Sequence, residues 1–366
     1  MLRVTKINTP QGFAVLRQEW NALLSGLKQQ DMLLSHEWFT MCQRWFCRGG
    51  ALFVLVVHDG LDLVGIAPLQ IRTVTRWGIS VRQLMFLHEG LPWYRGGFIL
   101  AGHSDRILMA ILAFLREHRQ EWDYARFDGV AERSPTVMAL SHLATQCGLT
   151  AGAWRVFNEP SILPIAGTWE GFLESQGSHF RKNIRNSEHR LQRMGHLEIL
   201  TVTSPKEVSE YLQVMYDMEV DNHRFQQEQS PESDQVSASA GLYLAGEFAK
   251  RGATEVKLLT VDGAPLAGWC SITHHGTSYA LVTKHSHRYA KLSPGRVIMY
   301  AYVRDTWKSG VERIDYLMKW PYVQRWTSHT ERYLGVECFH DGIRSQVLRG
   351  AHRIRKMLRR RPVALR

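Results

Sequence analysis

The residues with the clearest chemical potential form the turn Ser293-Pro294-Gly295, which follows a predicted strand at 279–285 and opens a predicted helix. Serine suits the N-cap, proline the first helical position, and Gly310 the position just past the helix end. A helix that begins in this way directs unpaired backbone N–H groups and a partial positive charge beyond its first turn. Phosphate groups bind at such places, so the turn predicts a seat for the phosphates of a nucleotide.

Two side chains after this helix have the chemistry for proton transfer. Asp315 lies in the next predicted strand, 312–318, and is a candidate general base or a residue that orients an acceptor. The sequence leaves a structural role for Asp315 open, as a strand cap or as the partner of an arginine. Tyr322 is a candidate acid for a leaving group, although a tyrosine within an aromatic loop more often packs.

Basic and imidazole side chains supply candidate contacts to an anionic ligand. Arg181 and Arg185 stand four residues apart in the predicted helix 180–194, so they share a helix face. That face is either a positive wall for phosphates or an anionic acceptor, or a solvated surface. His287 is a candidate for lining the acceptor side, and Arg325 belongs to a loop rich in aromatic residues.

Composition limits the classes of protein that fit. The chain has 366 residues, 45% of them hydrophobic and 22% charged, and a formal net charge of +11. This is ordinary globular composition. Its positive charge suits a polyanionic cofactor, a nucleic acid or an anionic membrane face. Five scattered cysteines without a CxxC pair, no metal-ligand spacing and no apolar leader predict a cytoplasmic protein without a metal site.

The two halves of the chain resemble each other. Both carry the pattern x-x-Asp-Gly-x-x-Leu-x-Gly, at 57–65 and at 260–268, and both continue with a helix and a strand that ends in aspartate. We therefore expect a duplicated, two-lobed fold. The predicted division is a first lobe at 1–158, a second at 159–342, and a basic C-terminal helix and tail at 343–366.

Four segments of the second half, in this order, resemble those of a known family: the basic stretch 180–195, 261–268, the turn 293–295, and 310–326. The region that they span is similar to the N-acetyltransferase (GNAT) superfamily, and within it to acyltransferases of the CelD/BcsL type. These are linked to cellulose and exopolysaccharide synthesis and are related to the FemABX aminoacyl transferases. The resemblance covers the second half well and the first half only by topology.

The resemblance implies a fold, a donor and an acceptor. The fold is α/β, with two tandem GNAT-like lobes, each a mixed, mostly antiparallel sheet flanked by helices. The implied donor is acetyl-CoA or another acyl-CoA. A sugar or polysaccharide precursor is the implied acceptor, and polysaccharide-synthesis machinery at the inner membrane face is an implied partner. The donor would lie along the strand residues and the helix start, namely Val282, Thr283, Lys284, His285, Ser293, Pro294, Gly295 and Arg296.

Departures from the family pattern keep other functions open. Val323 stands where the family has lysine, Lys319 where it has glycine, and the usual glycine-rich phosphate loop is absent. The alternatives are a FemABX-like transferase that uses aminoacyl-tRNA, and a non-catalytic binding protein that kept the fold. A nucleic-acid binder lacks any supporting motif. We expect the amphipathic basic helix after Ile343 to dock on the second lobe, with contact to an anionic membrane as the alternative.

Overall fold

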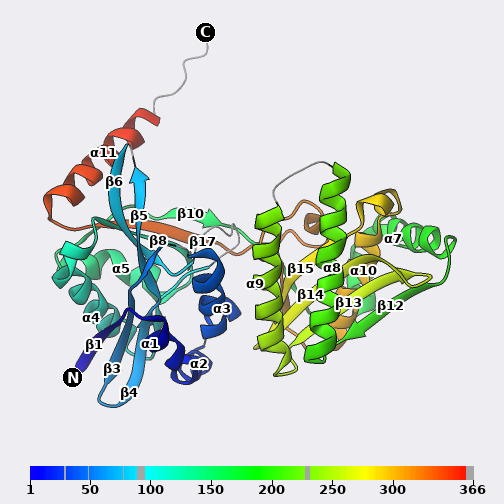
Figure 1. The fold of residues 1–366 in the computed structure, drawn as a ribbon, viewed down its shortest axis with the longest axis horizontal. Coiled ribbons are helices and arrows are strands. Elements are labelled where there is room, and N and C mark those ends of the chain that lie inside the picture. Colours follow the sequence, from blue (N-terminus) through cyan, green and yellow to red (C-terminus); the bar gives the residue numbers. More distant parts are fainter. Residues whose placement is uncertain (29, 48, 77, 89–94, 227–230, 360–366) are drawn as a thin grey trace, which may run out of the picture. The chain divides into compact units, whose positions relative to one another are not determined.

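The computed structural model describes residues 1–28, 30–47, 49–76, 78–88, 95–226 and 231–359. The chain forms two compact units (Figure 1): unit 1 holds Met1–Glu159 and Arg332–Arg366, and unit 2 holds Pro160–Glu331. Helices flank mixed sheets in both units, and most neighbouring strands run antiparallel. The predicted fold class, α/β with mixed, mostly antiparallel sheets flanked by helices, is confirmed.

Unit 2 is built on a six-stranded sheet with the order β11-β16-β15-β14-β13-β12. Its central strands form an antiparallel meander, and the pair β15–β16 is parallel because helix α10 connects the two strands. The strands are β11 (Ile162–Pro164), β12 (Leu197–Val202), β13 (Thr254–Val261), β14 (Ala264–His274), β15 (Thr277–His285) and β16 (Arg313–Asp315).

Helices cover both faces of this sheet. Side chains alternate along β14, so that Trp269 joins the core beneath α7 and α10 while Cys270 joins the core beneath α8 and α9. Two helical layers therefore enclose the sheet, and both cores are apolar. The helices are α6 (Trp169–Ser175), α7 (Gly177–Gln192), α8 (Pro205–Gln226), α9 (Pro231–Ala249) and α10 (Pro294–Lys308).

The hairpin between β13 and β14 explains one glycine of the family pattern. Asp262 and Gly263 form the turn with φ of 48° and 78°, as a two-residue type I′ turn requires. The Asp262 carboxylate accepts a hydrogen bond from the backbone N–H of His196 at 2.8 Å. A Cβ on Gly195 would lie 2.0 Å from that carboxylate, so this close approach requires glycine.

Unit 1 contains two sheets, with the orders β1-β3-β4-β7 and β10-β17-β8-β6-β5-β2, and β9 pairs with β17. Strands β6 and β8 are parallel and are connected through α4, like β15 and β16 in unit 2. The strands are β1 (Leu2–Ile7), β2 (Ala51–Leu52), β3 (Val54–Asp59), β4 (Asp62–Ala67), β5 (Leu69–Arg76), β6 (Ile79–Phe86), β7 (Ile99–Leu100), β8 (Tyr124–Ala131), β9 (Thr150–Ala151), β10 (Arg155–Asn158) and β17 (Tyr333–Phe339).

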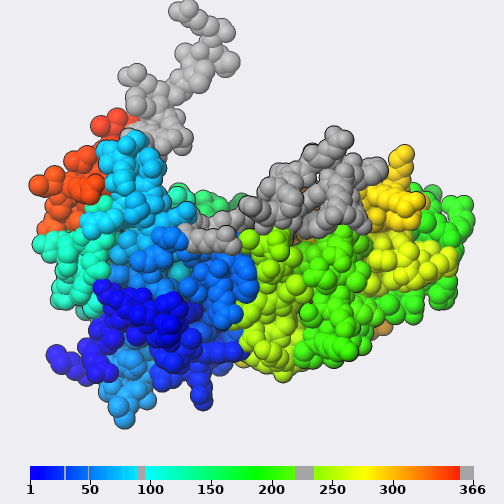
Figure 2. Space-filling model, in the orientation of Figure 1, coloured from blue at the N-terminus to red at the C-terminus, as the bar shows by residue number. Residues whose placement is uncertain are grey.

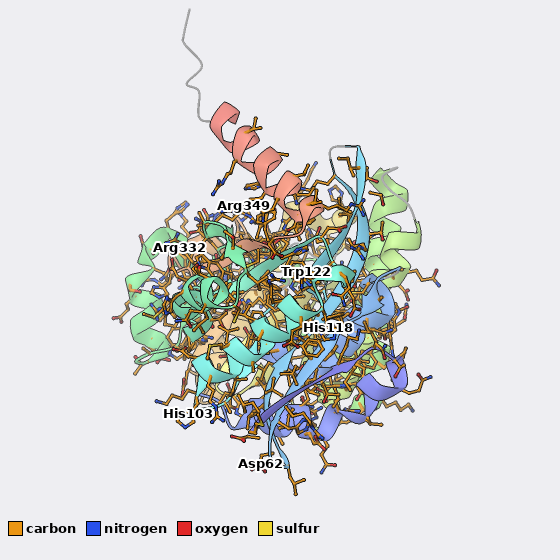
Figure 3. All side chains as sticks on the ribbon, turned by 90° about the vertical axis from the view of Figure 1, so that its left-hand side faces the viewer. Asp62, His103, His118, Trp122, Arg332 and Arg349 are labelled. Carbon is orange, nitrogen blue, oxygen red and sulfur yellow. The ribbon has the colours of Figure 1, made fainter. Side chains whose placement is uncertain are left out.

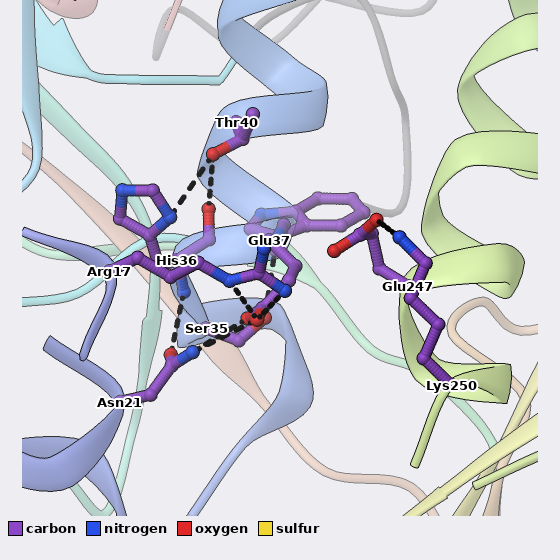
Figure 4. Close-up of polar contacts among 9 residues, drawn as sticks. Arg17, Asn21, Ser35, His36, Glu37, Thr40, Glu247 and Lys250 are labelled. Carbon is purple, nitrogen blue, oxygen red and sulfur yellow. Dashed lines mark hydrogen bonds and ion pairs between the residues drawn. The ribbon is translucent and has the colours of Figure 1, made fainter. Parts of the chain in front are cut away.

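Helices and buried ion pairs complete unit 1. The carboxylate of Glu37, which is fully buried, accepts hydrogen bonds from Arg17 and Asn21 (Figure 4). These partners offset the cost of burying a charge. The helices are α1 (Pro10–Val15), α2 (Arg17–Ser25), α3 (His36–Met41), α4 (Ser104–Glu117), α5 (Pro135–Gln146) and α11 (Ile343–Arg359).

Strand β17 belongs to unit 1, although it follows unit 2 in the sequence. It lies between β8 and β10, with register pairs such as Cys338↔Ala125 and Arg155↔Gly335. The sequence analysis placed this strand in the second lobe. The structure differs because a strand's neighbours are set by long-range pairing, which its own alternating pattern does not encode.

Helix α11 packs on unit 1 (Figure 2). Its Leu348 joins a small cluster with Val81, Tyr124 and Phe339, and its buried Ser345 accepts a hydrogen bond from the His340 N–H at 3.0 Å. The expectation that α11 docks on the second lobe is therefore wrong. Among the described residues, no helix has both the length and the apolar content that a bilayer crossing needs.

Candidate functional site

The strand before the predicted turn continues beyond its parallel partner. Strands β15 and β16 pair from Thr277↔Arg313 to Tyr279↔Asp315, where β16 ends, and β15 runs on to His285. A bulge lies within β15 at Leu281, because Ala280 and Val282 pair with the adjacent residues Ser271 and Cys270 of β14. Such a bulge bends a strand and turns its backbone groups. The four predicted donor-binding residues 282–285 all lie in this extension.

The start of α10 follows β15 after a short 3₁₀ helix, His287–Leu292. Pro294 is at the first helical position and Gly310, at φ 76°, follows the helix end, so both predictions are confirmed. Ser293 is the N-cap residue, but its hydroxyl makes no cap hydrogen bond, so that part of the prediction is wrong. Its backbone is left-handed (φ 59°, ψ 50°), whereas a capping side chain normally requires an extended residue.

The first turn of α10 has space beside it on the side of β15. A Cβ on Gly295 would meet only the His285 ring, at 3.9 Å. The pKa of His285 is lowered, first by partial burial and then by the neighbouring charge of His287, so its ring is neutral at pH 7. The first turn contains no acidic residue, so nothing within it opposes the positive end of the helix dipole for an incoming anion.

Three arginines surround this helix start. Arg296, in the first turn, donates to the backbone oxygen of Asn183 at 3.4 Å and to the Ser187 hydroxyl at 3.0 Å. Its pKa is lowered by partial burial and by the nearby charges of Arg325 and Arg190. We call Arg190, Arg296 and Arg325 the arginine cluster. Within the part of the chain that the structure describes, none of the three forms an ion pair with a carboxylate.

The arginine cluster is held in place by α7. Arg190 donates to the Ser187 hydroxyl at 3.4 Å and to the backbone oxygen of Lys291 at 3.3 Å, just before the turn. Ser187 itself is fully buried on the face of α7 that carries Ile184 and Leu191. Like charges held together without a counter-ion raise the local positive potential, and an anion at the helix start would relieve it.

Sequence reasoning missed the polar contacts beneath the cluster. Asn183, Ser187 and Arg190 recur at helical spacing beside the apolar Ile184 and Leu191, and this pattern was the available signal. Of the predicted acceptor-binding residues, only Arg325 joins the cluster. Three others lie elsewhere or at the surface: Arg181 donates to the backbone oxygen of Leu173 at 3.0 Å, and Arg185 and His287 are exposed.

Asp315 lies inside the protein at the end of β16. Its side chain is fully buried, and its Oδ1 accepts a hydrogen bond from the Leu317 N–H at 2.8 Å. Leu317 has a φ of 63°, which a bulky residue adopts only when surrounding contacts hold it. The contact shows how Asp315 fixes the bend by which the chain leaves β16. Its role as a general base remains a prediction.

Tyr322 and Val323 lie on the segment that follows this bend. Tyr322 is 41% exposed and stacks on Trp320, with the ring centroids 6.1 Å apart. Desolvation by its neighbours raises the pKa of Tyr322 to about 12, so its hydroxyl keeps its proton at neutral pH. Val323 is fully buried in the apolar core, where a lysine would have to bury its charge. The departure from the family pattern therefore suits its surroundings.

The described residues contain no group of three or more His, Cys, Asp or Glu side chains arranged to hold a metal ion. The groups described above are backbone N–H groups, guanidinium groups, one buried carboxylate and a phenol. These groups bind a polyanion, stabilise negative charge and supply a proton.

Comparisons with known proteins bear on the fold that carries these residues. Residues 178–325 match the family model described as an acetyltransferase (GNAT) domain. No curated protein matches the sequence. Among solved structures, the chain is similar to FemX, with a TM-score of 0.62, 12% identity, and coverage of 90% of this chain and 96% of that chain.

Two further structures resemble the whole chain. The L-PGS structure from Bacillus licheniformis has a TM-score of 0.53 and 10% identity, and the match covers 94% of this chain and 97% of that one. The C-terminal domain of a putative lysylphosphatidylglycerol synthetase from Agrobacterium fabrum has a TM-score of 0.52, 12% identity, and coverage of 88% and 92%. At these identities the likeness shows the fold. Unit 2 thus contains a GNAT acetyltransferase-fold domain.

Proposed function

We propose that unit 2 is an acyltransferase that takes its acyl group from acetyl-CoA or another acyl-CoA. The observation that carries this proposal is the arginine cluster at the start of α10. It combines three guanidinium groups with the N-terminus of a helix. This helix follows β15, which extends beyond its pairing with the parallel strand β16. The pyrophosphate of CoA is a polyanion of the size and charge that such a place binds.

The proposed donor lies with its phosphates at the helix start and its pantetheine arm along β15. Backbone N–H and C=O groups of Val282, Thr283, Lys284 and His285 hydrogen-bond the amides of the arm, as an added strand would. In the reaction, a nucleophilic amine or hydroxyl of the acceptor attacks the thioester carbonyl, a C–N or C–O bond forms, and the C–S bond breaks. The acceptor loses one proton and the departing thiolate gains one.

Residues after β16 supply the remaining steps in this proposal. Tyr322, whose phenol carries its proton at neutral pH, protonates the departing thiolate, and the acceptor's proton passes to solvent water. Asp315 acts indirectly. The hydrogen bond that its carboxylate accepts from the Leu317 N–H holds the bend that leads to Tyr322. We assign the acceptor side to Arg181, Arg185 and His287, which lie outside the arginine cluster, with a sugar or polysaccharide precursor as acceptor. The resemblance to CelD/BcsL-type proteins supports that choice.

A second candidate donor is aminoacyl-tRNA. The likeness to FemX over 90% of this chain favours it, together with the net charge of +11. The chemistry at the carbonyl is the same, because an amine attacks an activated acyl group in both cases. The leaving group differs: a ribose hydroxyl of the tRNA replaces the thiolate, and because its oxyanion is much more basic, its departure depends more strongly on protonation by an acid.

A thermal-shift titration separates the two donors. A ligand raises the melting temperature according to its concentration relative to its Kd. We expect acetyl-CoA and CoA to stabilise the wild-type protein and to lose this effect in Arg296→Ala, whereas Arg106→Ala, a variant at the same position of α4 in unit 1, keeps it. Stabilisation by aminoacyl-tRNA alone would replace the first candidate by the second. No shift with either would contradict both.

A further inference from the structure

Helix α11 presents an apolar stripe to solvent. Ile343, Val347 and Ile354 are 85%, 58% and 57% exposed, values far above those of core residues of the same types. At 100° per residue, the three project within about 40° of one another on the helix. Leu348 and Ser345, which pack on unit 1, lie on the opposite side. The stripe therefore faces away from the surface to which α11 is anchored.

Basic residues flank the stripe on both sides. Arg344 and Arg353 are exposed, and Arg349, which is labelled in Figure 3, is half-buried. Arg344 is tethered to unit 1, since it donates to the Ser80 backbone oxygen at 3.1 Å. From Ile343 to the last residue, the sequence contains nine Arg and Lys residues and no Asp or Glu. This segment is thus a positively charged surface with an apolar centre.

Three kinds of partner would cover an apolar stripe, and charge distinguishes them. A second copy of this chain would bring the same arginines face to face, which costs free energy. A nucleic acid would satisfy the arginines but would leave the apolar side chains in water. An anionic bilayer satisfies both: apolar side chains enter the boundary between headgroups and acyl chains, and arginines contact lipid phosphates.

We propose that α11 binds a membrane surface rich in anionic phospholipids, with Ile343, Val347 and Ile354 inserted between the headgroups. Because α11 is fixed to unit 1 through Leu348, Ser345 and the contact of His352 Nδ1 with Glu337 Oε2 at 2.9 Å, the membrane would hold unit 1 through a helix that is part of its fold. This proposal is independent of the reaction proposed for unit 2.

The test is co-sedimentation of the full chain with two kinds of vesicle, phosphatidylcholine alone and phosphatidylcholine with phosphatidylglycerol. We expect binding to the second kind only, and weaker binding as salt is raised. The change Val347→Asp should lower the partition coefficient about tenfold or more, since it places a carboxylate in the stripe. The matched control is Met138→Asp on α5, whose methionine is 86% exposed in the same unit, and it should bind like the wild type.

Each other outcome overturns the proposal. Equal binding to both kinds of vesicle would contradict the role of the arginines, and an unchanged partition coefficient for Val347→Asp would contradict insertion of the stripe. If the protein does not bind vesicles but forms a dimer that Val347→Asp dissociates, the stripe is an interface between copies. Ile354→Ser provides a second variant, and thermal unfolding shows that each variant is folded.

Discussion

The segments β6–α4–β8 of unit 1 and β15–α10–β16 of unit 2 share a topology, because each connects two parallel strands through a helix. They differ in the path of the chain after the first of the two strands. In unit 1 the connection after β6 returns to the strands, and Gly96 donates a backbone hydrogen bond to Gly129 of β8 at 3.1 Å. In unit 2 the connection after β15 instead runs towards α7, where Arg190 binds the Lys291 oxygen.

The starts of the two connecting helices differ in charge as well. Arg106 and Arg296 both occupy the third helical position. Arg106 lies beside an acidic neighbour, Asp105, and 3.9 Å from the Asp59 carboxylate, so the first turn of α4 is neutralised. Arg296 has two further arginines around it instead. In our proposal, unit 1 uses this topology as a scaffold, whereas unit 2 uses it to bind an anion.

The largest effect should follow a charge reversal at the third helical position. We expect Arg296→Glu to weaken CoA binding a hundredfold or more, roughly 3 kcal/mol, because it removes one cation and adds a charge that repels phosphate. Arg106→Glu should leave CoA binding unchanged. Isothermal titration calorimetry measures both Kd values. If the two variants bind CoA equally well, the distinction between the two helix starts fails.

Buried His88, two residues after β6, should make the stability of the chain sensitive to acid. Full burial lowers the pKa of His88 from 6.5 to about 3. Below pH 6.5 the His88 imidazole therefore binds a proton in the unfolded state but not in the folded state. The free energy of unfolding is highest above pH 6.5 and decreases as the pH falls. The loss is roughly 3 kcal/mol at pH 4.

Chemical denaturation between pH 7 and pH 4 measures this loss. His88→Gln should flatten the pH dependence of the free energy of unfolding, while His287→Gln, at the same distance past β15 but exposed, should leave it as it is. A His88→Gln protein with the wild-type pH dependence would show that the burial of His88 is not linked to proton binding.

Substitutions at Asp315 and Asp128 should differ in their effects on stability and on acyl transfer. Asp315→Asn still accepts from Leu317, but without a formal charge, and we expect a loss of roughly 1–2 kcal/mol in unfolding free energy. Asp128 forms ion pairs with Arg126 and Arg155, both about two-fifths exposed. Because solvent screens these pairs, Asp128→Asn should lower the free energy of unfolding by less than the loss of a fully buried ion pair would. Acyl transfer should fall with Asp315→Asn only. A loss of transfer in both variants would point to general destabilisation.

The smallest effect concerns Tyr322. We expect Tyr322→Phe to lower kcat about tenfold with KM unchanged, because a thiolate with a pKa near 8.5 already leaves well without an acid. Val15→Ala, a change at an exposed residue of unit 1, should leave kcat unchanged. A Tyr322→Phe enzyme with full kcat would remove the phenol from the mechanism.

Much of unit 2 follows from local sequence patterns. The bounds of α10 and the position of β15 were predicted from proline, glycine and alternation, all of which act within a few residues. The Asp-Gly dipeptide predicted the same hairpin turn in both halves, and this prediction is wrong for unit 1. Asp262-Gly263 forms the turn in unit 2, whereas in unit 1 Asp59 pairs with Asp62 and the turn shifts to Gly60 and Leu61.

The candidate site could be predicted only in parts. Arg296 and Arg325 were recognised one by one from their places beside the turn and in the aromatic loop. The contacts of Arg190 and Arg296 with Ser187 depend on how α7 packs on α10, which the periodicity of either helix leaves undetermined. The predicted match of Asp128 with Asp315 is not exact. Asp315 forms the last rung of its parallel pair, while Asp128 lies two residues beyond the last rung of its own.

Hydrogen exchange at the first turn of α10 tests the central claim most directly. If the helix start binds the phosphates of the donor, saturating CoA should slow exchange of the amides of Gly295, Arg296 and Val297, and leave those of the first turn of α4 unchanged. Protection of α4 instead, or CoA binding that leaves the first turn of α10 unprotected, would contradict the account.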